Sequence, residues 1–126
     1  MPPTPELLAR FLVERHFSKQ KLLVKPGAFL PEFYQGTFVT SAFDIDGLSD
    51  ADAWIIGETH VAAPRAKALH GHAEFRNVDL ADIGLEFKSH EPPPRHGDVV
   101  GWSEEKETRI SAAQELAARS TLKLKP

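Results

Sequence analysis

Three consecutive prolines at residues 92–94 constrain the fold of this chain more than any other feature. A proline has no backbone N–H to donate to a neighbouring strand, so residues 91–98 are predicted to form a stiff loop outside any sheet interior. Residues 85–90, just before that loop, alternate between apolar and polar side chains, which is typical of a half-exposed strand. The second half of the chain is therefore expected to contain strands joined by a rigid loop.

Other segments show the periodicities of regular structure. Thr4 and Pro5 form a favourable helix start, and Ser49 followed by Asp52 resembles a capping box. The sequence predicts further strands over residues 37–45 and 69–78, and helices over residues 5–15, 50–62 and 103–120.

The length of 126 residues fits one domain, and 41% hydrophobic residues suffice to build a core. The fold class predicted for residues 1–126 is a single α+β domain. We expect a small, antiparallel, three- to four-stranded sheet with about three helices on one face.

The chain has no cysteine, which excludes disulfides, thiolate zinc sites and cysteine nucleophiles. This composition fits a reducing cytoplasm. No apolar stretch approaches the roughly 20 residues that cross a bilayer, so no membrane association is expected. We also find no nucleotide-binding loop or nucleophile elbow, and no cofactor is predicted.

Charge is unevenly distributed although the net charge is only −3. Residues 1–25 carry five basic and two acidic side chains, whereas residues 26–64 carry six acids and no Lys or Arg. The basic N-terminal segment could contact a nucleic-acid backbone, but a solvated surface is the simpler interpretation. A protein partner is the main expectation.

Five of the six histidines lie between His60 and His96. His70 and His72 are two residues apart on a predicted strand, so both imidazoles would point the same way and could bind one metal. The alternative is that both lie on the solvated face of that strand, beside Glu74 and Arg76.

His96, in the proline-rich loop, is the best candidate for catalysis. Asp98 could orient its imidazole as a general base, while Arg95 and Lys25 could hold a phosphate or carboxylate. The alternative for His96 is a bond to a backbone carbonyl that locks the loop. Trp102, after the loop, is either a ligand- or partner-binding anchor or a core residue.

Three stretches, at residues 24–31, 43–49 and 71–106, resemble a group of small bacterial proteins of unknown function. The resemblance implies a bacterial cytoplasmic origin and a single domain. The group has Tyr-Gly-Arg-Ala where this chain has His70-Gly71-His72-Ala73, which speaks against a metal site common to the group.

The leading hypothesis is an accessory, regulatory or immunity-type protein that binds a macromolecular partner. The alternative is a small histidine-dependent enzyme, with or without the assistance of a metal, that acts on a phosphorylated or nucleotide substrate.

Overall fold

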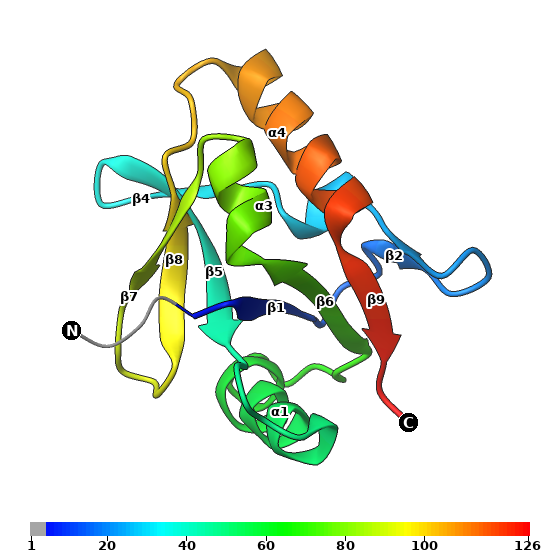
Figure 1. Cartoon of the computed structure of the whole chain (residues 1–126). Coiled ribbons are helices and arrows are strands. Elements are labelled where there is room, and N and C mark those ends of the chain that lie inside the picture. The colour runs from blue at the N-terminus through cyan, green and yellow to red at the C-terminus, as the bar shows by residue number, and fades with distance from the viewer. Residues whose placement is uncertain (1–4) are drawn as a thin grey trace.

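The computed structural model describes residues 5–126 as a single α+β domain around a seven-stranded antiparallel sheet (Figure 1). The strands lie in the order β7-β8-β5-β1-β6-β9, and β4 also pairs with β5. Their bounds are β1 (Leu7–Leu12), β4 (Glu32–Tyr34), β5 (Thr37–Asp44), β6 (Gly71–Arg76), β7 (Glu86–Ser89), β8 (His96–Val100) and β9 (Thr121–Leu124). A separate hairpin, β2 (Phe17–Ser18) and β3 (Leu23–Val24), projects from the domain. The α+β prediction is confirmed, but the sheet exceeds the predicted three to four strands.

Three helical segments cover both faces of the sheet, whereas the sequence predicted helices on one face. They are α1 (Asp50–Gly57), which continues through the π-helical turn η2 (Glu58–Ala62) into α2 (Ala63–Arg65), then α3 (Asn77–Asp82) and α4 (Lys106–Arg119). The consecutive residues Leu8 and Ala9 of β1 belong to different apolar clusters, one including α3 and α4 residues and the other including α1 and η2 residues. The central strand is therefore buried on both sides.

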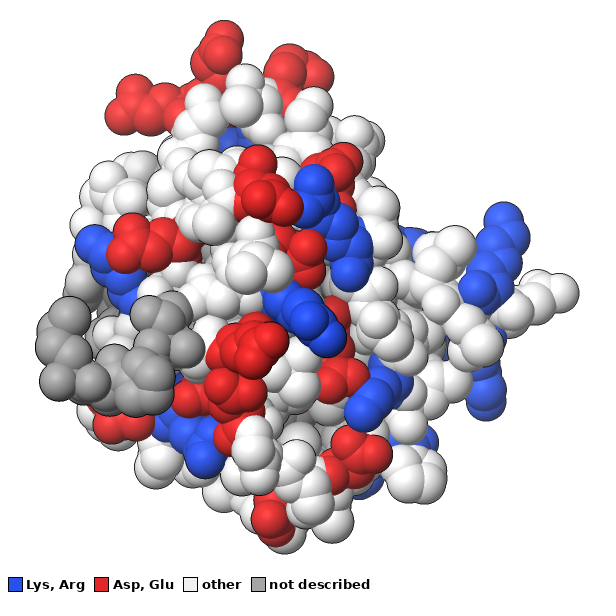
Figure 2. Space-filling view, in the orientation of Figure 1, with Lys and Arg blue, Asp and Glu red and all other residues white. Residues whose placement is uncertain are grey.

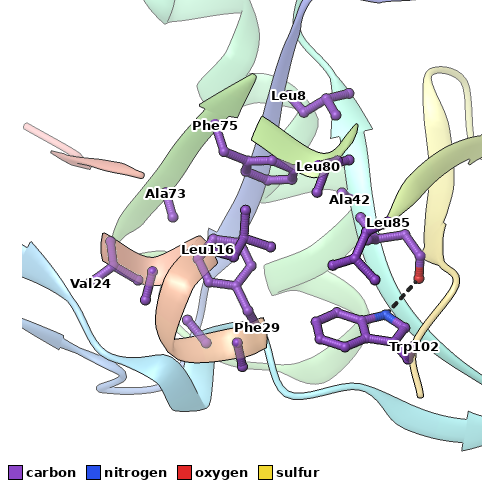
Figure 3. Packing of buried hydrophobic residues seen from close by; sticks show 14 of the residues in the cluster. Leu8, Val24, Phe29, Ala42, Ala73, Phe75, Leu80, Leu85, Trp102 and Leu116 are labelled. Carbon is purple, nitrogen blue, oxygen red and sulfur yellow. Dashed lines mark hydrogen bonds between the residues drawn. The ribbon is translucent and has the colours of Figure 1, made fainter. Parts of the chain in front are cut away.

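The core beneath α3 and α4 is built around aromatic rings (Figure 3). Phe29, from the segment before β4, meets Phe75 of β6 edge-on with ring centroids 5.3 Å apart. Trp102 closes the core, is only 8% exposed, and donates from its indole Nε1 to the Val99 carbonyl at 3.0 Å. Trp102 is thus placed as a core residue.

The predicted helix over residues 5–15 is wrong, because Leu7–Leu12 forms the central strand β1. Its predicted cap, Thr4, lies outside the described residues. A strand buried on both faces has a nearly continuous apolar sequence, and such a short run does not distinguish strand from helix. Only Arg10 interrupts this run.

The predicted half-exposed strand at residues 69–78 is β6, but its second face is also covered. His72 is 1% exposed and lies beneath Trp54 of α1, with ring centroids 4.8 Å apart. On the other edge of β6, strand β9 pairs closely, and a Cβ at Gly71 would come within 2.2 Å of the Lys123 carbonyl oxygen. Strand β9 was not among the elements predicted from the sequence.

Several local predictions are confirmed. The alternating segment at residues 37–45 is β5, and Ser49 caps α1 by accepting a hydrogen bond from the Asp52 N–H at 3.1 Å. The C-terminal helix is α4, which begins a few residues later than predicted. The proline loop is shorter than expected because β8 begins at His96, where Gly97 leaves room for the Phe87 ring.

Within residues 5–126, no helix combines the length and apolar character needed to cross a membrane.

Burial of His72 makes the protein sensitive to acid. Burial lowers the pKa of His72 to about 4, the positive charge of Lys123 adds to this effect, and Asp50 opposes it. Both ring nitrogens lack hydrogen-bond partners among the described residues, although Glu74 lies 3.9 Å from Nε2. The usual histidine pKa is about 6.5, so the unfolded chain binds this proton more readily than the folded chain does. The contribution of His72 to the free energy of unfolding is therefore fully present above pH 6.5 and is lost as the pH falls toward 4.

We therefore predict that titration of His72 lowers the free energy of unfolding by about 3 kcal/mol as the pH falls from 7 to 4. Urea unfolding of wild type and His72→Phe across this range measures it, because the variant keeps an aromatic ring but does not titrate. His72→Leu serves as a second control should the larger ring pack poorly. Parallel pH profiles for wild type and both variants would contradict this prediction.

Candidate active site

The candidate site lies where the sheet forks. Strand β5 pairs with β4 through residues 37–39 and with β1 through Phe43 and Asp44. Between these two pairings, Arg10 Nη1 donates to the Ser41 carbonyl and Arg10 Nε donates to the Ala28 carbonyl, both at 3.0 Å. The guanidinium therefore occupies the fork and satisfies a carbonyl group of β5 between the two strand pairings.

The surroundings of Arg10 disfavour the positive charge of its guanidinium. Burial lowers its pKa, the positive charge of Arg65 adds to this effect, and Glu32 opposes it. A guanidinium nevertheless stays protonated at neutral pH. Neither Arg10 nor Arg65 takes part in an ion pair within the part of the chain that the structure describes. Two cations without an ion-pair partner among the described residues therefore lie close together, an arrangement that attracts an anion despite the nearby charge of Glu32.

Two hollows meet at these arginines. The first has a volume of about 120 Å³ and is lined by Arg10, Phe11, Ser41, Phe43, His60, Val61, Arg65, Pro93 and His96. The second, about 230 Å³, shares Arg10, Phe11 and Arg65 with the first and has a polar lining that includes Glu14, His16, Glu32 and Lys67. Together they form a recess beside the fork, between the end of the α1–α2 segment and the sheet.

Ser41 and His96 form a hydrogen-bonded pair in the first hollow. Antiparallel pairing sets Phe43 opposite His96, so the Ser41 side chain, two residues earlier on β5, is on the same face. His96 Nδ1 lies 2.7 Å from the His90 carbonyl oxygen, which only accepts hydrogen bonds. Nδ1 therefore carries the proton, and Nε2 of the neutral ring accepts the Ser41 hydroxyl proton at 2.7 Å. A hydrogen bond in this direction, from the serine hydroxyl to the imidazole, suits a general base that acts on a hydroxyl group.

The two predicted catalytic residues lie near each other but form no hydrogen bond with each other in the described part of the chain. Asp98 does not orient His96, because its Oδ2 lies 2.8 Å from His90 Nδ1. The carbonyl of His90 orients His96 instead. A group of three side chains in residues 5–126 could hold a metal ion, because one ligand atom from each lies within 4.8 Å of the others. They are His90, His96 and Asp98.

The predicted anion-binding residues of the loops lie elsewhere. Arg95 donates from Nη1 to the carbonyls of Asp44 and Asp46, both at 3.1 Å, and so ties the proline loop to the turn after β5. Lys25 is exposed at the start of the 3-10 turn η1 (Pro26–Ala28) and lines neither hollow.

His70 and His72 do not form a pair of exposed metal ligands. The His70 ring lies 5.6 Å from Phe17, whereas the His72 ring is enclosed by Phe11 and Trp54. The strand face that was expected to be solvated is therefore covered at His72 by helix α1.

The projecting β2–β3 hairpin carries the basic charge predicted for the N-terminal segment, with Lys19 and Lys21 exposed there. In Figure 2, Lys and Arg extend from this projection, while acidic side chains gather at the N-terminal end of α4. Positive and negative groups intermingle between these two regions on the face shown, so this face has no continuous basic stripe.

Four residues of the first hollow were not predicted from the sequence as site residues: Arg10, Ser41, His60 and Arg65. Arg10 offered a signal, because it is the one charged residue within the apolar run of residues 7–13. Ser41 offered none, since its partner His96 is 55 residues away in the sequence.

No protein-family model matches the chain, and no match was found among the curated proteins or the solved structures.

Proposed function

We propose that this protein is a small enzyme of the bacterial cytoplasm that acts on a phosphorylated substrate. The phosphate group binds at Arg10 and Arg65, and His96 serves as the acid–base group. The observation that carries this proposal is the convergence of two arginines without carboxylate partners, among the described residues, on the hollow that contains the Ser41–His96 pair. The absence of cysteine from the sequence supports a reducing compartment.

Several properties of the hollow favour a phosphate group. A buried cation is costly unless an anion compensates it, and a guanidinium binds phosphate oxygens through two parallel hydrogen bonds. Arg10 donates one hydrogen bond from Nη1 and one from Nε to backbone carbonyls, and these two bonds fix the plane of the guanidinium. The volume of about 120 Å³ is below the roughly 300 Å³ of pockets for whole drug-sized ligands, so it suits a small charged group.

The second hollow offers room for the remainder of the substrate. It adjoins the first at Arg10 and Arg65, and its volume is about 230 Å³. The lining combines Glu32, His16 and Lys67, which present both donors and acceptors. These groups favour a polar body such as a sugar or nucleoside over an apolar chain.

Substitution of Arg65 tests the phosphate site without disturbing the fork, because Arg65 is exposed and its Nη1 bonds only within its own helix, to the Val61 carbonyl. We predict that Arg65→Gln weakens binding of inorganic phosphate and of AMP at least tenfold, equivalent to about 1.4 kcal/mol, in calorimetric titrations. Arg76→Gln is the matched control, since Arg76 is exposed and lines neither hollow. Equal affinities for wild type and Arg65→Gln, or no binding by wild type at millimolar phosphate, would refute the phosphate site.

A second candidate function is binding of a macromolecular partner as an accessory, regulatory or immunity-type protein. The β4–β5 hairpin favours it, because this hairpin projects from the domain (Figure 1) and leaves Phe33 67% and Tyr34 53% exposed. Leu30, just before the hairpin, is also 43% exposed. Exposed aromatic side chains are enriched in protein interfaces.

For this second function, we predict that a Phe33→Ser/Tyr34→Ser variant loses partners that wild type retains from host extract, while Arg65→Gln keeps them. Quantitative mass spectrometry of the captured proteins, with chain stability checked by thermal melting, is the measurement. Identical capture by wild type and the hairpin variant would exclude the hairpin as the contact surface.

A further inference from the structure

The Ser41–His96 geometry carries the proposed function one step further. We infer that Ser41 is the nucleophile of a phosphoryl transfer and forms a transient phosphoserine. This inference rests on the proposed phosphate site and adds to it the group that attacks phosphorus.

The hydrogen bonds of His96 identify the group that it can deprotonate. A neutral imidazole has one lone pair available as a base, and the His90 carbonyl confines that lone pair to Nε2. Ser41 Oγ lies against Nε2 at 2.7 Å, so the serine hydroxyl occupies the position that an attacking water would need. His96 is therefore placed to activate Ser41 rather than a water.

The backbone of Ser41 links the nucleophile to the proposed anion site. Its carbonyl accepts the hydrogen bond from Arg10 Nη1 at 3.0 Å, and Ser41 and Arg10 both line the first hollow. Strand β8 holds the other side of β5 through the register that sets Ser41 opposite Asp98. The attacking oxygen and the phosphate-binding guanidinium thus have a fixed separation, and such fixed positioning lowers the barrier of a transfer reaction.

The step balances without a further reagent. Ser41 Oγ forms a bond to phosphorus as the bond from phosphorus to the substrate's leaving oxygen breaks, and the hydroxyl proton passes to His96 Nε2. The attacking and leaving oxygens lie in line on opposite sides of phosphorus, so the leaving oxygen takes a proton from water while the imidazolium of His96 keeps the Ser41 proton. In the second half, a water attacks phosphorus from the side of the departed oxygen and releases a proton to the solvent. The bond from phosphorus to Ser41 Oγ breaks, His96 returns its proton to that oxygen, and inorganic phosphate is released. Arg10 and Arg65 stabilise the charge on the transferring group in both halves.

An alkyl fluorophosphonate tests this inference directly, since attack by an activated serine forms a stable Oγ–P bond and releases fluoride. We expect one adduct on wild type, located at Ser41 by tandem mass spectrometry and slowed by added inorganic phosphate. His96→Gln should react at least 100-fold more slowly, because it removes the general base. Ser103→Ala is the matched control and should be labelled like wild type, since Ser103 lies outside both hollows.

Ser41→Ala separates this inference from the proposed phosphate site. It should lose labelling yet remain folded, as a cooperative melting transition shows, and still bind inorganic phosphate, since the arginines remain. Phosphate binding by wild type without a His96-dependent adduct at Ser41 would overturn the nucleophile and leave the phosphate site in place. Failure of wild type to bind phosphate would overturn the proposed function itself.

Discussion

The Arg10 guanidinium at the fork between β1 and β4 is the constraint on which the site depends. Strand β5 cannot pair with both neighbours over its whole length, and Arg10 donates to the Ser41 carbonyl where the strand partners change. A half-buried charge is costly, and Arg65 raises this cost because it is a second cation. An apolar residue at position 10 would avoid the cost but would leave the carbonyls of Ala28 and Ser41 without these bonds. The fork therefore combines structural hydrogen bonds with a charge that is available to a ligand.

The two helical layers give this fork its surroundings. The layer formed by α3 and α4 buries the face of β1 that carries Leu8, and it provides a rigid base. The α1–α2 segment covers the opposite face and ends beside the recess, so its last residues contribute His60, Val61 and Arg65 to the lining. The site therefore lies at the rim of a well-packed domain, where residues held by strands meet residues from the end of a helix.

Local signals in the sequence predicted much of the secondary structure. Alternation predicted β5 because one residue in two along that strand points to each side, and Ser49 predicted the start of α1 because its hydroxyl caps the helix. β1 could not be predicted in this way, since burial on both faces removes the alternation that marks a strand. The burial of His72 was also hidden, because it depends on where α1 packs after the chain has folded.

The candidate site was less accessible to sequence reasoning than the fold. His96, which the sequence singled out as a catalytic candidate, lines the first hollow, but the expected helper Asp98 bonds to His90. Arg10 and Ser41 are separated by 31 residues, and Ser41 and His96 by 55 residues, so only the strand register brings them together. A wrong assignment of β1 as helix necessarily hid the fork and the role of Arg10.

The direction of the Ser41–His96 hydrogen bond is the claim on which the chemistry depends most directly. Long-range ¹H–¹⁵N NMR of the histidine side chains at pH 8, above the usual imidazole pKa, measures which ring nitrogen carries the proton. We predict that His96 is protonated at Nδ1, with a bare Nε2 that accepts from Ser41, and that Ser41→Ala shifts the Nε2 resonance. Protonation at Nε2 would reverse the hydrogen bond, make the serine hydroxyl an acceptor, and contradict the role of His96 as its base.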